Sequence, residues 1–171
     1  MIKNIDISKE KKKEILGYVI YIFSLLFLFT YVIGLGRCVS GSMEPYMYTN
    51  DYLIYNRLAY INDIPERGDV ISFDKGNDIF CKRVVGIEGD KISFQNGALY
   101  INNIQVKEDY LLEKRPTVCE DEFVVPEGSV FVLGDNRMFS NDSRYWEYPF
   151  VDIDYINGKV FCVIPTHKLV E

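Results

Sequence analysis

Two serines close together near the start of the chain, Ser40 and Ser42, have the side chains best suited to nucleophilic chemistry. They lie in the segment 39–45, which reads VSGSMEP. The glycine between them permits a tight backbone that exposes a hydroxyl and directs an amide N–H at a developing oxyanion, while Pro45 stiffens the exit. Ser-x-Ser is also a common loop pattern, and taken alone the segment favours an ordinary turn.

A serine nucleophile needs a base that can accept its proton near neutral pH. His167, the only histidine, lies close to the C-terminus, where a frayed tail would hold it poorly for a Ser-His-Asp triad. Lys82 is the other candidate base. A lysine serves only when apolar surroundings desolvate its ammonium group and lower its pKa.

Lys82 lies in a segment typical of a strand, 79–86, which reads IFCKRVVG. Alternation along a strand puts Phe80 and Val84 on the same face as Lys82, so the segment contains the apolar neighbours that a lysine base needs. Taken alone, however, the segment favours an exposed lysine beside an equally exposed Arg83.

The composition limits the other classes of function. The chain has 171 residues and a net charge of −6, which favours a single globular domain and disfavours a nucleic-acid-binding surface. The sequence has no Cys-x-x-Cys pair and no obvious ligand cluster, so it does not indicate a metal site. A lysine base needs no cofactor. At least some of the cysteines are expected to be buried free thiols, although disulfides in three connectivities stay open: Cys38, Cys81, Cys119 and Cys162.

One apolar segment precedes the serines. Residues 15–36 contain no Asp, Glu, Lys or Arg, and as an α-helix they would rise about 33 Å against a hydrocarbon core of about 30 Å. The run is longer than the apolar core of a cleavable signal peptide, so a signal anchor is favoured. Four lysines directly before it predict a cytoplasmic N-terminus (1–14) and an extracytoplasmic domain (37–171): Lys9, Lys11, Lys12 and Lys13. A buried helix of a soluble protein is the alternative.

The segment 37–171 is predicted to be mainly β, an antiparallel sheet or barrel-like domain, because short runs rich in Ile, Val, Tyr and Phe recur between turn signals. Asn96-Gly97 indicates a hairpin, and Asn102-Asn103 indicates a second tight reversal. The predicted strands are 52–55, 70–73, 80–85, 91–94, 98–101, 130–133 and 159–163.

Four separated segments together resemble the signature boxes of bacterial type I signal peptidases, in the family's order. They are 40–45 (SGSMEP), 67–70 (RGDV), 82–90 (KRVVGIEGD) and 134–146 (GDNRMFSNDSRYW). A further stretch, 97–112, is similar to the family's hairpin and following strand. The resemblance covers nearly all of the chain beyond Arg37, and four boxes in order behind an apolar anchor are far more specific than any one of them.

The resemblance implies a serine endopeptidase with a Ser/Lys dyad that removes signal peptides from exported preproteins at Ala-x-Ala-like sites, on the outer face of the cytoplasmic membrane. Ser42 would be the nucleophile and Lys82 the general base. Ser40 would complete the oxyanion hole, and Ser140 would orient the lysine. Asp142 and Arg144 would form a supporting ion pair, while three residues would hold the loop that presents the site: Asp135, Asn136 and Arg137. No metal or cofactor is implied.

The same reasoning predicts the partners and leaves two alternatives. Secretory preproteins and the lipid bilayer are the expected partners, and the protein is expected to be a monomer. An apolar rim at Met43, Tyr46 and Met47 is expected to dip into lipid. Activity should favour neutral to alkaline pH. A self-cleaving repressor shares the dyad and a similar β-fold, but the membrane span counts against it. A non-enzymatic, membrane-anchored β-domain is the other alternative, and the presence of both Ser42 and Lys82 counts against that.

Overall fold

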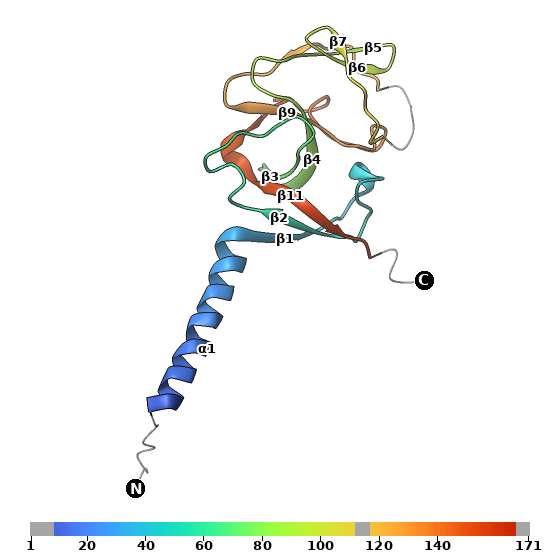
Figure 1. Cartoon of the computed structure of the whole chain (residues 1–171). Helices are drawn as coiled ribbons and strands as arrows, with labels where there is room; N and C mark the ends of the chain where they lie inside the picture. Colours follow the sequence, from blue (N-terminus) through green and yellow to red (C-terminus); the bar gives the residue numbers. More distant parts are fainter. Residues whose placement is uncertain (1–8, 112–116, 167–171) are drawn as a thin grey trace.

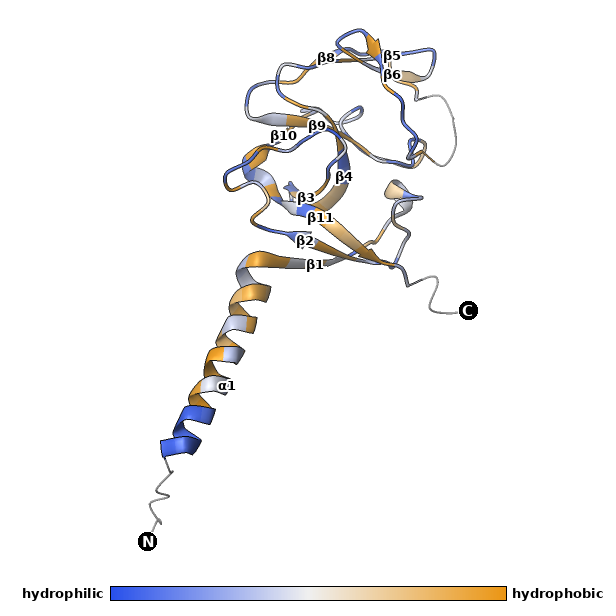
Figure 2. Cartoon of the chain, in the orientation of Figure 1, coloured by the Kyte–Doolittle hydropathy of each residue, from blue (hydrophilic) through white to orange (hydrophobic). Residues whose placement is uncertain are grey.

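The computed structural model describes residues 9–111 and 117–166, in which one helix leads into a body of β-strands (Figure 1). Helix α1 spans Lys9–Phe27 and continues through one π-helical turn, Leu28–Val32. None of its residues is buried, and mostly hydrophobic residues follow its hydrophilic first turns (Figure 2). The helix Lys9–Val32 is therefore long and apolar enough to cross a membrane.

The helix ends earlier than the apolar run 15–36 predicts. Residues Ile33–Arg37 form strand β1, which pairs antiparallel with β2 (Tyr52–Asn56). Gly34 permits this pairing because the ring of Tyr55 covers its backbone, and a Cβ on Gly34 would lie 2.0 Å from that ring. An uncharged apolar run does not by itself separate a helix from a buried strand, so the sequence alone did not reveal the boundary.

Two antiparallel sheets form the body, which confirms the prediction of a mainly β, antiparallel fold after one apolar helix. The larger sheet has the order β1-β2-β11-β3-β4-β9-β10. Its remaining strands are β3 (Val70–Lys75), β4 (Asp78–Gly86), β9 (Ser129–Leu133), β10 (Val151–Asp152) and β11 (Ile156–Ile164), with the 3-10 turn Ile153–Tyr155 between the last two.

The smaller sheet has the order β7-β6-β5-β8 and lies at the end of the body away from α1 (Figure 1). Its strands are β5 (Lys91–Gln95), β6 (Ala98–Ile101), β7 (Ile104–Gln105) and β8 (Phe123–Val124). Asn96 and Gly97 both have positive φ and join β5 to β6, and Asn102 and Asn103 do the same between β6 and β7. Both predicted reversals are therefore confirmed.

All seven predicted strands lie within observed strands. The strands that the sequence did not predict are β1, which was assigned to the apolar helix, and three two-residue strands, β7, β8 and β10. Such short strands depend on the backbone partner beside them and leave almost no alternating pattern in the sequence.

Buried side chains under the segment 38–47 hold its path. Met43 and Met47 are each 1% exposed and pack with Cys38, Leu53 and Tyr55. The predicted lipid-facing rim at Met43, Tyr46 and Met47 is therefore wrong, because both methionines point into the core. All four cysteines are free thiols in this structure.

Candidate active site

Ser42 lies in a single 3-10 turn, Gly41–Met43, that directly follows β1 and the extended residues 38–40. A Cβ on Gly41 would lie 2.8 Å from Oε1 of Glu44, the flexible end of a side chain that can move aside. Ser42 is buried, while Ser40 is exposed and its Oγ donates a hydrogen bond to Ser42 Oγ at 3.2 Å. The turn therefore presents both hydroxyls at one point.

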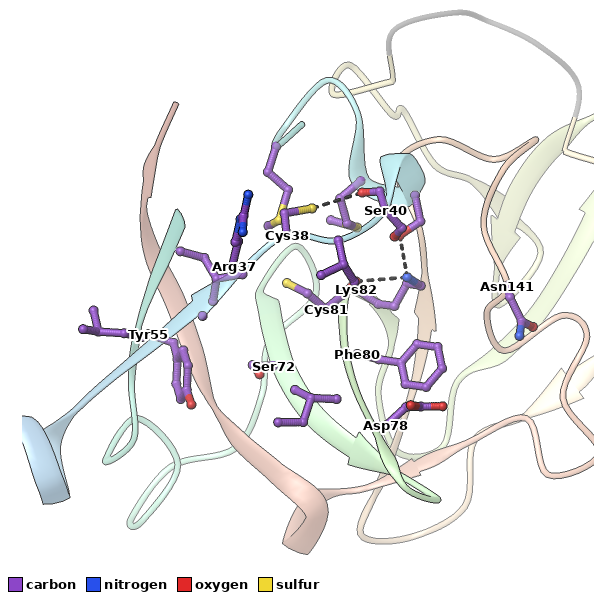
Figure 3. A pocket seen from close by; sticks show the side chains of 18 of the residues that line it. Arg37, Cys38, Ser40, Tyr55, Ser72, Asp78, Phe80, Cys81, Lys82 and Asn141 are labelled. Atoms are coloured by element: carbon purple, nitrogen blue, oxygen red, sulfur yellow. Dashed lines mark hydrogen bonds between the residues drawn. The ribbon is translucent and has the colours of Figure 1, made fainter. Parts of the chain in front are cut away.

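Lys82 meets Ser42 from strand β4. Its Nζ lies 2.7 Å from Ser42 Oγ and donates a hydrogen bond to the carbonyl oxygen of Cys81 at 3.1 Å (Figure 3). Only 3% of Lys82 is exposed, so the exposed lysine that the segment alone favours is wrong. The Phe80 ring, on the same strand face, has its centroid 5.6 Å from Nζ, as alternation predicted.

Burial lowers the pKa of Lys82, because removing the ammonium group from water disfavours its charged form. The carboxylates of Asp142 and Asp135 oppose this shift. Each is held by an arginine, Asp142 by Arg144 and Asp135 by Arg83, which offsets its charge. Burial thus makes the neutral amine easier to form than it is in water, and a neutral amine beside a serine hydroxyl is the pairing that general-base activation requires.

Ser140 reaches the site but does not make the hydrogen bond to the lysine that the resemblance implied. Its side chain is buried, with 6% of the residue exposed, and Oγ has no hydrogen-bond partner among the residues that the structure describes. A Cβ on Gly134 would lie 2.2 Å from Ser140 Oγ and 2.5 Å from the carbonyl oxygen of Ser42. Ser140 therefore packs against the loop that contacts Ser42.

Asp142 and Arg144 form a fully buried ion pair beneath that loop. Arg144 Nε donates to Asp142 Oδ1 at 2.8 Å, and its Nη2 donates to the carbonyl oxygen of Arg137 at 2.9 Å. Asp142 Oδ2 accepts the backbone N–H of Gly134 at 3.0 Å. The pair thus binds the loop 134–137 at both of its ends, in keeping with the supporting role that the resemblance implies.

Asp135 is held by Arg83, which the sequence segment alone placed on the surface. Arg83 Nε and Nη2 donate to the two carboxylate oxygens at 2.8 Å and 2.6 Å, and 9% of Arg83 is exposed. The rings of Tyr46 and Tyr110 lie 5.1 Å and 4.3 Å from its guanidinium carbon. The feature of the sequence that could have indicated the burial of Arg83 is the apolar run on both sides of Lys82 and Arg83.

Asn136 connects this loop to the predicted nucleophile. Its backbone N–H donates to Ser42 O at 3.0 Å, and its side-chain Nδ2 donates to Gly41 O at 3.1 Å. These two bonds fix the carbonyls of the turn that carries Ser42. The structure therefore brings together residues that the chain separates widely. The other candidate base, His167, lies outside the described residues.

An open cleft of about 620 Å³ runs over the Ser42–Lys82 contact. One wall is the segment 35–40, the other is formed by Ile79, Phe80 and Cys81, and Phe139 and Asn141 also line it. Strand β9 pairs with β4 only from Arg83 onward, so residues 78–82 of β4 bond β3 on one side and leave the cleft side of the strand open. An extended peptide can therefore align along this edge.

The described part of the chain contains no group of three His, Cys, Asp or Glu side chains arranged to hold a metal ion. Four carboxylates in this part of the chain are instead bonded to arginines: Asp90, Glu108, Asp135 and Asp142. The chemistry available from the residues themselves is nucleophilic attack by a hydroxyl with an amine as the base.

Comparisons with known proteins point to one family. A sequence model of the family described as "Signal peptidase, peptidase S26" matches residues 12–164. A signal peptidase IB of Staphylococcus aureus (strain COL) is 33% identical over 171 aligned positions, covering 87% of this chain and 88% of that protein. A probable signal peptidase I-2 of Synechocystis is 35% identical over 130 positions, covering 71% of this chain and 58% of that protein.

Among solved structures, a signal peptidase I from Enterococcus faecalis V583 has a similar fold. The TM-score is 0.52 at 31% identity, and the match covers 58% of this chain and 98% of that one.

Proposed function

Because the chain belongs to the signal peptidase family, peptidase S26, we propose that it cleaves signal peptides from exported preproteins with Ser42 as nucleophile and Lys82 as general base. The observation that carries this proposal is the 2.7 Å contact between Lys82 Nζ and Ser42 Oγ in a cleft open to an extended peptide. No metal or cofactor has a part in the proposed reaction.

The reaction begins when neutral Lys82 takes the proton of Ser42 and Oγ attacks the scissile carbonyl. The hydroxyl of Ser40 and the backbone N–H of Ser42 would stabilise the resulting oxyanion. The lysine ammonium then gives its proton to the leaving amine, which releases the mature protein and leaves the signal peptide esterified to Ser42. Lys82 next deprotonates a water that attacks this ester, and returns the proton to Ser42 Oγ as the ester bond breaks and the signal peptide leaves.

The cleft supports a preference for small residues before the cut. Its walls bring apolar side chains and thiols close to the dyad, among them Cys38, Ile79 and Cys81. A peptide that lies extended along β4 places alternate side chains toward these walls, so residues one and three positions before the cut would enter the cleft. We therefore propose cleavage at Ala-x-Ala-like sites.

The proposal includes a single-pass anchor with the N-terminus inside and the catalytic domain on the extracytoplasmic face of the cytoplasmic membrane. Lys9, Lys11, Lys12 and Lys13 lie exposed at the start of α1, and positive charge is retained on the cytoplasmic side. Since β1 follows the helix without a linker, Ser42 would stay close to the membrane surface, where signal peptides emerge. A monomer suffices, because one chain supplies the whole dyad.

The test is cleavage of a preprotein with an Ala-x-Ala site by the detergent-solubilised full chain, with the products identified by mass spectrometry. We expect one cut directly after the second alanine. Replacing that alanine by tryptophan in the substrate should abolish the cut, whereas replacing the middle residue should not. A wild-type protein that leaves the preprotein intact would instead favour a non-enzymatic anchored domain.

The pH dependence should follow the ionisation of Lys82. Because the neutral amine is the active base and burial lowers its pKa, kcat/KM should rise about tenfold per pH unit on the acid side and level off once Lys82 is neutral. The expected plateau begins below the ordinary lysine pKa of about 10.4. A rate that is independent of pH from 5 to 9, with the fold intact by circular dichroism, would contradict this assignment.

A further inference from the structure

Two residues outside the signature boxes contact the two arginines that hold the loop 134–137, which are Arg83 of β4 and Arg137 of the loop itself. They lie after β7, in the segment 106–111, in which the N–H of Val106 donates to the carbonyl oxygen of Leu99 in β6 at 2.9 Å. We propose that Glu108 and Tyr110 of this segment are positioning residues for Ser42, acting through Arg137 and Arg83. The proposal rests on the proposed function of the site and extends it to its supporting residues.

Glu108 forms a buried ion pair with Arg137. Their side chains are 8% and 4% exposed, and the guanidinium group contacts both carboxylate oxygens. Tyr110 OH donates to Glu108 Oε1 at 2.5 Å, and Arg137 Nη1 donates to Thr117 Oγ1 at 3.2 Å. Of the hydrogen bonds that Arg137 makes within the described residues, only those to Glu108 reach a carboxylate.

Arg137 passes this restraint to the nucleophile through the loop backbone. Its Nε donates to Gly134 O at 3.0 Å. Within the span from Gly134 to Arg137 lies Asn136, whose two hydrogen bonds hold the carbonyls of Gly41 and Ser42. A change in the position of Arg137 therefore changes the path of the three residues before it, and with it the turn that carries Ser42.

Tyr110 acts on the second arginine. Its ring lies 4.3 Å from the guanidinium carbon of Arg83, on a side chain whose Nε and Nη2 hold Asp135 in the same loop. The ring thus covers the Arg83–Asp135 pair while the hydroxyl orients Glu108. The segment after β7 in this way restrains Asp135 and Arg137, which lie on either side of Asn136.

Charge balance makes Glu108 necessary. Asp135 is held by Arg83 and Asp142 by Arg144, so each already has a partner. Removing the charge of Glu108 would leave the guanidinium of Arg137 buried without compensation, and a buried charge in that position moves toward water or draws in water. Either response releases the Gly134 contact and loosens the loop behind Ser42.

The experiment compares Glu108→Gln with Asp109→Asn in the full chain in detergent. Asp109 is the adjacent residue, pairs with Lys107 and is 72% exposed in its side chain, so the control makes the same change of charge outside the network. We expect Glu108→Gln to lower kcat by about 10-fold or more with KM within about 2-fold, since a small misplacement of reacting groups costs rate and not binding. Asp109→Asn should match the wild type.

Amide hydrogen exchange supplies a readout that does not need activity. Peptides covering residues 38–47 and 134–137 should exchange faster in Glu108→Gln and unchanged in Asp109→Asn. If Glu108→Gln does not fold, Tyr110→Phe decides, because it removes only the hydroxyl that orients Glu108 and should lower kcat about 2- to 5-fold. The proposal would be overturned if the wild type, Glu108→Gln and Asp109→Asn had equal kcat and equal exchange. It would also be overturned if Glu108→Gln lost activity through KM alone.

The two proposals fail in different ways. A wild-type protein that cuts no preprotein, yet shows faster exchange at Ser42 in Glu108→Gln, would leave the positioning intact and remove the function. A wild type that cuts well, with an unchanged kcat and unchanged exchange in Glu108→Gln, would leave the function intact and remove the positioning role.

Discussion

Replacing Lys82 by methionine is expected to lower the rate of preprotein cleavage by at least about 10⁴-fold, the scale of loss when a member of a nucleophile–base unit is removed. Methionine has nearly the length of lysine and no ionisable group, so Ser42 would lose its proton acceptor without a change in packing. The measurement is kcat/KM on an Ala-x-Ala preprotein, with Lys91→Met as the control, because Lys91 is half-exposed and pairs with Glu122 far from the cleft.

The same substitution should not destabilise the fold. Burial lowers the pKa of Lys82 relative to the unfolded chain. At neutral pH Lys82 therefore binds a proton more readily in the unfolded chain than in the folded site, and this difference opposes folding. The free-energy cost falls as the pH rises toward about 10.4, the ordinary lysine pKa. The unfolding midpoint of Lys82→Met at pH 7 should equal or exceed that of the wild type. Lost activity with a lowered midpoint would indicate misfolding instead of a lost base.

Ser42→Ala provides the complementary result. If the two side chains act as one unit, each single variant should be about as inactive as the double variant Ser42→Ala/Lys82→Met, because the second change removes nothing further. Additive losses in the double variant would mean that the two residues act independently. A single variant that retains more than about one hundredth of the wild-type rate would exclude that residue from the proposed roles.

Strands were predictable where the sequence carries local information about both their ends and their alternation. The hairpin β5–β6 is an example, because Asn96 and Gly97 take the positive φ values that a tight reversal requires. The end of α1 was not predicted, since the run into β1 has no charge or proline, and its glycines, Gly34 and Gly36, lie inside the span assigned to the helix. Its position depends on Tyr55, whose ring covers Gly34.

The site was predictable as far as motifs fix residue types, and less so where burial depends on distant partners. Ser42 and Lys82 were identified from four boxes and lie in contact. The burial of Arg83 depends on Asp135 and on two tyrosine rings, and Glu108 lies outside every box. No local pattern reports a partner that far along the chain.

The direction of side chains in the nucleophile segment was the clearest failure of local reasoning. Met43 and Met47 follow an exposed apolar anchor and were expected to contact lipid, yet they fill the core beneath the turn. A 3-10 turn at Gly41–Met43 directs neighbouring side chains differently from a strand or a helix, and glycine at position 41 gives no indication of which geometry will form.

Gly134→Ala is expected to lower cleavage by about 10²-fold or more, because a displacement of about 1 Å at reacting groups has that effect. The new Cβ would lie 2.5 Å from the backbone carbonyl oxygen of Ser42, and backbone cannot rotate away as a flexible side chain can. The turn carrying Ser42 must therefore shift relative to Lys82. Overpacking of this kind also costs about 1–3 kcal/mol of stability, to be measured by denaturant unfolding.

A second-site change separates the two contacts of that Cβ. Ser140→Gly in the Gly134→Ala background removes the atoms 2.2 Å and 2.5 Å away that belong to the Ser140 side chain, but leaves the carbonyl of Ser42 in place. The double variant should therefore recover stability more than activity. Gly17→Ala is the matched control, because a Cβ there meets no atom within 4 Å. Full recovery of cleavage in the double variant would show that Ser140, and not the Ser42 carbonyl, is what Gly134 protects.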